Sequence, residues 1–195
     1  MRKAAVNIYK FEELDHEAQE KAIEWYRSGF EFDDFYQSYH TETFTSWCHA
    51  IGLEISKWGW SGFYSQGDGA HFVGRYYYQK GWGRKLAEVC GCPEFIDIAM
   101  RLQSIQKRHF YSVYAEVKHM GHYQHEYCTS IDAWAQNRQE LNIDDEEGVK
   151  ECFRDIMRLF YESLRQEYEY ETGDERISEI LQDDFYEFTS DGKVW

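Results

Sequence analysis

The segment from residue 53 to residue 78 restricts the fold most, because here the apolar spacing changes from helical to extended. It is rich in aromatic and β-branched side chains, which pack well on the pleated surface of a sheet. The run is interrupted by Ser65-Gln66-Gly67-Asp68-Gly69-Ala70. Asp-Gly between two strand-like runs is typical of a type I′ hairpin turn, in which both central residues need a positive φ. We therefore expect two strands joined at Asp68-Gly69.

Helical patterns lie on both sides of this block. Asp15 is a predicted N-cap, and Pro93 suits a first helical position because its missing N–H costs nothing there. Acidic residues after residue 143 favour the N-terminus of a long helix. The expected helices run from Asp15 to about Arg27, from near Asp33 to Gly52, from Pro93 through Ile105, from near Asp144 through Leu164, and from about Ile177 to Leu181.

Further strands are predicted at Phe110 to Val117, at Tyr123 to Trp134 and, as a closing strand, at Phe185 to Phe188. The order of helices and strands predicts an α+β fold, in which an antiparallel sheet of aromatic-rich hairpins packs with helices. At 195 residues, we expect a single domain over residues 1–195 with an acidic, helical C-terminal part from about residue 140.

The start of the chain and its cysteines favour an intracellular protein. No apolar run of signal-peptide length follows the first basic residues, and no stretch reaches the roughly 18 apolar residues that span a bilayer. The five cysteines are odd in number and mostly scattered, which suits free thiols in a reducing compartment. We therefore expect no membrane interaction and a cytoplasmic location.

The charge is strongly negative and unevenly distributed. The formal net charge is -15, and residues 140–195 hold 18 acidic against 6 basic residues. Such a field repels nucleic acids and anionic lipids and favours a partner with a basic surface. These acids are also explained as the solvated side of a helix, although their excess is larger than solubility needs. The candidate partner-binding residues are Glu162, Glu167, Glu169, Glu171, Asp174, Glu175, Asp183 and Asp184.

Three histidines and a cysteine recur at intervals of three, at His119, His122, His125 and Cys128. Imidazole and thiolate are good zinc ligands, but residues three apart point to opposite faces of a strand, so we expect neither a metal nor another cofactor. His122 or His125 near Asp68 is suited to polarising a water or a phosphate. Hydrogen-bonded or solvated strand histidines are the favoured interpretation, and no motif of a known enzyme class is present.

The hairpin turn explains Asp68 and Gly69 but not the two polar residues before them. Ser65 and Gln66, with Asp68, His122 and His125, are therefore the candidate binding residues. If they form one site, the two predicted hairpins must lie side by side.

Three stretches carry a resemblance to a known group of proteins. Gly62 to Phe72, Gly121 to Glu126, and the opening Tyr9 to Leu14 followed by Glu17 to Ala22 resemble a widespread group of small bacteriophage and prophage proteins. Some of these are labelled antitoxins of toxin–antitoxin stability systems. The resemblance implies a phage origin and a role in the host cytoplasm, and it carries no chemistry. The acidic region from Glu140 lies outside it.

Charge and resemblance together predict a non-enzymatic phage accessory protein that binds and inhibits a host protein. The predicted target is a defence nuclease, with the acidic surface acting as a DNA mimic in an anti-CRISPR or anti-restriction role. One alternative is a small hydrolase or nucleotide-binding protein with its site at the two hairpins. Another is an antitoxin that neutralises a basic toxin.

Overall fold

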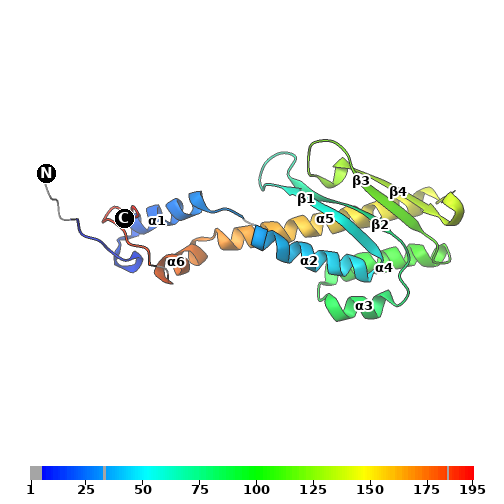
Figure 1. Ribbon diagram of the computed structural model, residues 1–195, viewed down its shortest axis with the longest axis horizontal. Coiled ribbons are helices and arrows are strands. Elements are labelled where there is room, and N and C mark those ends of the chain that lie inside the picture. The colour runs from blue at the N-terminus through cyan, green and yellow to red at the C-terminus, as the bar shows by residue number, and fades with distance from the viewer. Residues whose placement is uncertain (1–5, 33, 184) are drawn as a thin grey trace. The chain divides into compact units, whose positions relative to one another are not determined.

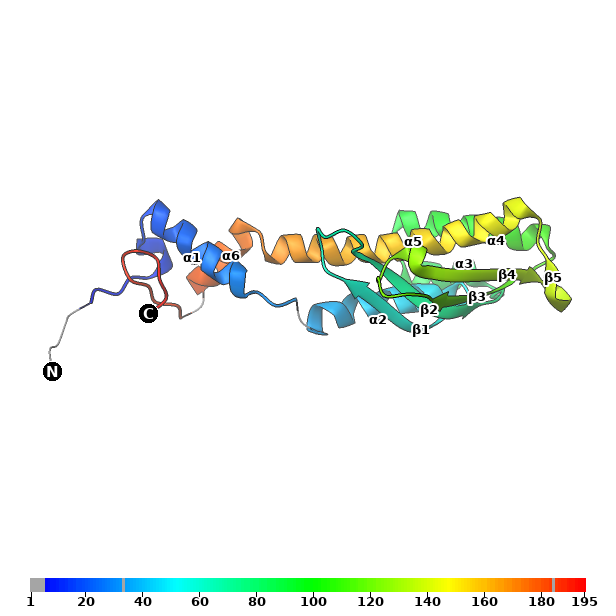
Figure 2. The ribbon, with the colours of Figure 1, turned by 90° about the horizontal axis from the view of Figure 1, so that it is seen from above.

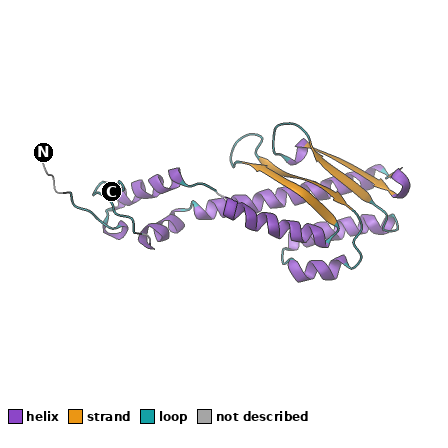
Figure 3. Cartoon of the chain, in the orientation of Figure 1, coloured by secondary structure: helices purple, strands orange, loops and turns teal. Residues whose placement is uncertain are grey.

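The structure is a computed structural model that describes residues 6–32, 34–183 and 185–195. The chain, for which one domain over residues 1–195 was expected, falls into two compact units. The terminal unit comprises residues 1–34 and 166–195, and the central unit comprises residues 35–165. The predicted α+β class with an antiparallel sheet is confirmed (Figure 3).

The central unit is built on one antiparallel sheet of five strands in the order β1-β2-β3-β4-β5. The first hairpin pairs Leu53 with Tyr76 at one end and Ser61 with Gly69 at the other, with a bulge between Ile55 and Lys57. Pairing of the two hairpins is short, covering Gly74–Tyr76 against Ala115–Val117. The strands are β1 (Leu53–Ser61), β2 (Gly69–Tyr76), β3 (Tyr114–His119), β4 (Thr129–Ala135) and β5 (Gln139–Glu140).

Aromatic side chains join one face of this sheet to the helices. The ring of Trp58 on β1 stacks on Phe160 of α5 with 4.1 Å between centroids, and Phe72 and Tyr76 on β2 contact Phe153 edge-on. Such pairs bury large apolar areas and add about 0.5–1.5 kcal/mol each beyond that burial. Figures 1 and 2 show the helices of this unit on one side of the sheet. They are α2 (Asp34–Ala50), α3 (Trp82–Val89), α4 (Pro93–Arg108) and the part of α5 (Ile143–Glu171) up to residue 165.

Several elements begin where the sequence predicts. Pro93 is the first residue of α4, and Asp15 caps α1 by accepting a hydrogen bond from the Ala18 N–H at 2.9 Å. Helix α3 was not predicted, because it is short and begins between two glycines, Gly81 and Gly83, that indicate a loop.

Both strands of the second hairpin begin later than predicted. Phe110 and Tyr111 take positive φ values of 51° and 61°, so the chain turns there and β3 begins only at Tyr114. The predicted strand from Tyr123 is wrong over its first half, where a loop and a short 3-10 helix, η2 (Glu126–Cys128), precede β4. Alternation of side chains cannot detect a turn made by residues of high strand propensity.

The terminal unit has its own core. Helices α1 (His16–Gly29) and α6 (Asp174–Asp183) and the 3-10 helix η1 (Phe11–Glu13) pack around buried residues that include Ala22, Ile177 and Phe188. The Arg27 Nε donates to the Thr172 carbonyl oxygen at 3.0 Å, which ties α1 to the segment between α5 and α6. The predicted closing strand Phe185–Phe188 is reduced to isolated bridges of Phe188 with Tyr9 and Val194.

Candidate functional site

The loop from Gly62 to Asp68 joins β1 to β2, and it is not the predicted two-residue turn. Neither Asp68 nor Gly69 takes a positive φ, whereas Tyr64 and Gly67 do, at 76° and 91°. Asp68 instead closes the loop on itself, because its carboxylate accepts the Ser65 N–H at 2.7 Å and its own N–H donates to the Ser65 carbonyl at 3.1 Å. The expected hairpin turn at Asp68-Gly69 is therefore wrong, and Gly69 is already the first residue of β2.

A second loop, from Met120 to His125, packs against this one. A Cβ atom added to Gly67 would lie 2.9 Å from Cδ1 of Tyr123, and one added to Gly69 would lie 3.0 Å from Cδ2 of His125. Both loops lie at the same end of the sheet in Figure 1. The structure thus places the two predicted motifs side by side, and the glycines are small because the second loop leaves no room for a side chain.

The five candidate binding residues do not all converge. His125 lies against Gly69 and next to the Asp68 loop, but the Asp68 carboxylate is used within its own loop. Ser65, Gln66 and His122 are exposed. The structure therefore brings together the backbone of the glycine loop and the His125 ring rather than a ring of five converging side chains.

His125 is held by a buried acid. Its Nδ1 atom accepts a hydrogen bond from the Tyr127 backbone N–H at 3.3 Å and lies 3.0 Å from a carboxylate oxygen of Glu126. The buried Glu126 carboxylate also lies 3.5 Å from a guanidinium nitrogen of Arg158 on α5. These two contacts at Nδ1 orient the imidazole and leave the Nε2 atom for other contacts.

Two histidines that no sequence pattern links form the most unusual contact of this region. The rings of His71 on β2 and His119 on β3 stack with 3.8 Å between centroids and 11° between planes. His71 is only 1% exposed, yet neither of its ring nitrogens has a hydrogen-bond partner among the described residues. The Nε2 of His119 lies 2.9 Å from the Tyr123 carbonyl oxygen and donates to it.

Gly59 makes this arrangement possible. It pairs with His71 across the first hairpin, and an added Cβ would lie 2.3 Å from Cε1 of His71 and 2.6 Å from Oε1 of Gln124. A glycine inside a strand is a known sign of a close approach, so Trp58-Gly59-Trp60 was the signal available in the sequence. Burial first, then His119 and then the Lys57 ammonium lower the pKa of His71 to about 4, so its ring is neutral at neutral pH.

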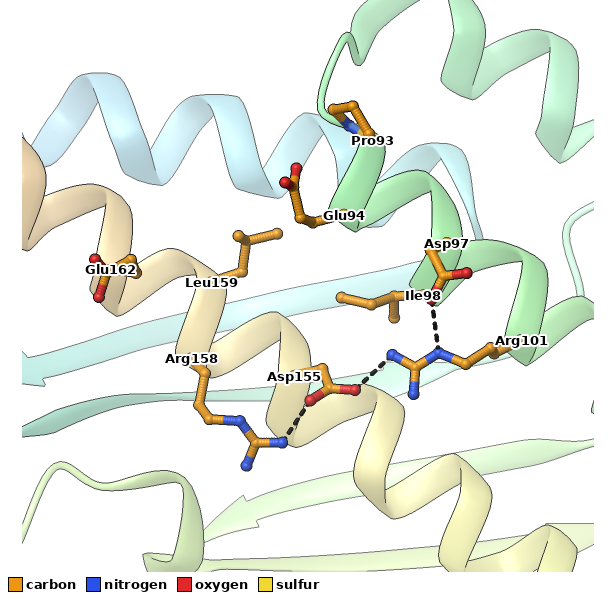
Figure 4. Close-up of a pocket in the computed structure, with 9 residues that line it drawn as sticks. All are labelled: Pro93, Glu94, Asp97, Ile98, Arg101, Asp155, Arg158, Leu159 and Glu162. Carbon is orange, nitrogen blue, oxygen red and sulfur yellow. Dashed lines mark hydrogen bonds and ion pairs between the residues drawn. The ribbon is translucent and has the colours of Figure 1, made fainter.

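A groove of about 730 Å³ lies between α4 and α5 (Figure 4). Its floor includes Ile98 and Leu159, and charged side chains surround them. Arg101 binds Asp97 at 3.2 Å and Asp155 at 2.5 Å, and Asp155 also binds Arg158. The lining holds four carboxylates against two arginines, so the groove is acidic overall, and it includes Glu162 of the predicted partner-binding acids.

The predicted partner-binding acids divide between the units. Glu162 belongs to the central unit and pairs with Arg165 at 2.8 Å. Glu171 is buried and binds Arg176 at 3.2 Å, so it is not part of an exposed surface, and Asp174 pairs with Arg27. Glu169, Glu175 and Asp183 are exposed and Glu167 is half-buried, all in the terminal unit, whereas Asp184 lies outside the described residues.

No three histidine, cysteine or carboxylate side chains in the described ranges gather closely enough to hold a metal ion. No helix within those ranges has the length and apolar character needed to cross a membrane. All five cysteines are free thiols.

The fold and the two packed loops define an α+β protein with helices on one face of an antiparallel sheet and a histidine-rich end. Residues 35–174 match the family described as Domain of unknown function (DUF8835), and the chain belongs to this family. The match begins at the first residue of the central unit and covers that unit completely. No curated protein and no solved structure matches the chain.

Proposed function

We propose that this chain is a non-enzymatic binding protein that inhibits a host protein with a basic surface, and that its terminal unit is the part that binds. The observation that carries the proposal is the division of charge between the units. The terminal unit holds 19 acidic against 7 basic residues, whereas the central unit holds 17 against 14. The acidic excess of the C-terminal region is therefore shared, within this unit, with acids from the N-terminal part of the chain.

The acids of the terminal unit follow one side of each helix. Glu17, Glu20 and Glu24 on α1 are exposed, opposite to the buried Ala18 and Ala22. Glu175, Glu179 and Asp183 on α6 are exposed and follow at intervals of four, about 6 Å per step along the axis. Exposed ion pairs such as Glu17 with Lys21 contribute little, so these carboxylates are free to exchange partners.

Exposed aromatic residues accompany the acids. Trp25, Tyr170 and Phe185 are among the exposed large apolar side chains of the terminal unit. Aromatic side chains add apolar contact and cation–π interactions with arginine and lysine, which are common at interface hot spots. Exposed carboxylates together with exposed aromatic rings therefore suit a partner protein with a basic surface.

A defence nuclease of the restriction or CRISPR kind is the target class we propose, because such enzymes bind DNA in basic channels and because the motifs resemble phage proteins. The test is cleavage of a plasmid by purified restriction and CRISPR nucleases, with the full chain added at increasing concentration. We expect inhibition of at least one nuclease that weakens as salt is raised. An unrelated protein of equal net charge is the control. Full activity of every nuclease at low salt contradicts the target class.

The contact between the two loops favours a second candidate function, a small hydrolase or nucleotide-binding protein. His125, oriented by Glu126, lies against the glycine loop at Gly69. We expect a nucleotide from a thermal-shift panel to raise the Tm of the wild type, and His125→Gln to remove that rise while His122→Gln does not. A panel without any shift removes this candidate.

A further inference from the structure

The face of the central sheet that is turned away from the helices differs in charge from the rest of the chain. Side chains alternate along a strand, so Lys57, His71 and Arg75 lie opposite to Trp58, Phe72 and Tyr76, which pack on the helix side. Lys118 on β3 likewise alternates with the buried Val117. In a chain of net charge -15, this face carries three basic residues, Lys57, Arg75 and Lys118, beside three acids. The acids are Glu54, Glu116 and Asp132, which the strand register places on the same face.

A hollow of about 480 Å³ lies on this face. Arg75 and Lys118 line it and both bind Glu116, at 3.3 and 2.7 Å. Lys57 is exposed and makes no ion pair with any residue of the described ranges. Of Lys57, Arg75 and Lys118, Lys57 is therefore the one that no carboxylate of the described residues neutralises, and it acts on the His71 ring, which stacks on His119.

The buried ring of His71 points to a ligand. A buried polar group without a hydrogen bond is destabilising, and both nitrogens of His71 are in this state. A metal ion shared by His71 and His119 does not explain it, because ring lone pairs lie in the ring planes and these planes are nearly parallel and 3.8 Å apart. An anion that accepts hydrogen bonds from the His71 ring is compatible with the stack, because His119 packs on that ring by its face and already donates its Nε2–H to Tyr123.

We propose that Lys57, His71 and His119 form an oxyanion site whose ligand is a phosphate group, either free or as a phosphate monoester. Gly59 pairs with His71, and Lys57 lies two residues away on the same face of β1, so Lys57 occupies a position diagonal to His71 in the sheet. The site uses none of the terminal-unit acids and is independent of the proposed function.

Binding at this site takes up a proton. Free His71 is neutral, and the titratable groups that act on it are His119 from β3 and Lys57 from β1. A bound anion stabilises the imidazolium form, which then donates from both nitrogens. Affinity for sulfate, whose own charge does not change near neutral pH, therefore increases as the pH is lowered from 8 to 6.

Calorimetric titration of the full chain with sulfate, inorganic phosphate and glycerol 3-phosphate tests the site. Lys57→Gln should weaken binding about tenfold or more, since a hydrogen bond to a charged group is worth about 1.5–3 kcal/mol. Lys85→Gln, an exposed lysine on α3 with the same change of charge, is the matched control and should bind as the wild type does. Tighter binding of glycerol 3-phosphate than of phosphate identifies a monoester, and equal binding identifies the free anion.

NMR titration of the His71 ring gives a second readout that does not depend on a variant. We expect added sulfate to raise the pKa of His71. The proposal is overturned if none of the three anions binds, if Lys57→Gln and Lys85→Gln bind equally, or if sulfate leaves the titration of His71 unchanged.

Discussion

At the scale of single residues, His71 departs furthest from its expected environment. Its position in an alternating strand predicts a side chain on the solvent side of the sheet, but Gln124 and His119 from the second hairpin cover it. Alternation within one strand describes the face to which a residue points and not what lies above that face. For this reason the row His119 to Cys128 is visible in the sequence, whereas the contact between His119 and His71 is not.

The buried ring predicts a dependence of stability on pH. The pKa of His71 is about 4 in the folded chain and about 6.5 in an unfolded one, so the unfolded chain takes up the proton first as the pH falls. Stability therefore decreases below about pH 6.5 and this loss is complete near pH 4. Between pH 7 and pH 5 we expect His71 to account for a loss of about 2 kcal/mol.

Urea unfolding at these two pH values checks this expectation. His71→Phe should reduce the loss of stability between pH 7 and pH 5, whereas His122→Phe, at an exposed loop position, should leave it as in the wild type. Equal pH dependence in all three proteins is inconsistent with a buried neutral His71.

At the scale of elements, the two loops at the end of the sheet show what could be predicted and what could not. Strand propensity located the first hairpin. Ser65 and Gln66, which a two-residue turn does not explain, already indicated a longer loop. The predicted type I′ turn is wrong because Gly69 does not take a positive φ. A glycine is needed there because His125 leaves no space for a side chain. This packing constraint comes from a loop more than 50 residues away in the sequence, so it leaves no local pattern around Gly69.

The packing of the two loops predicts how much stability is lost when a methyl group is added at Gly69. Gly69→Ala places Cβ 3.0 Å from Cδ2 of His125, so we expect it to destabilise the chain by about 1–3 kcal/mol. Gly91→Ala, where no atom lies within 4 Å, should change stability by about 0.5 kcal/mol or less.

A double-mutant cycle attributes this cost to the contact. In the background of His125→Ala the effect of Gly69→Ala should be smaller, because part of the clash is removed. If the two substitutions are additive in urea unfolding, the two loops do not pack as described.

At the scale of the whole molecule, charge and fold are divided between the two units. The α+β class was predictable because capping residues and aromatic strands are local signals, as at Asp15 and Pro93. The terminal unit was not predictable, since its halves lie at opposite ends of the sequence and share a core only after folding. Its acids therefore seemed to belong to a C-terminal region alone.

The central claim is that the terminal unit carries the binding surface. The most direct measurement is the affinity of an inhibited nuclease for two variants with equal loss of charge. One variant combines Glu175→Gln, Glu179→Gln and Asp183→Asn on α6, and the other combines Glu42→Gln, Glu88→Gln and Glu140→Gln at exposed positions of the central unit. We predict at least a tenfold weaker affinity for the first, from about 0.5 kcal/mol per carboxylate, and no change for the second. Equal affinities of the two variants would contradict the claim.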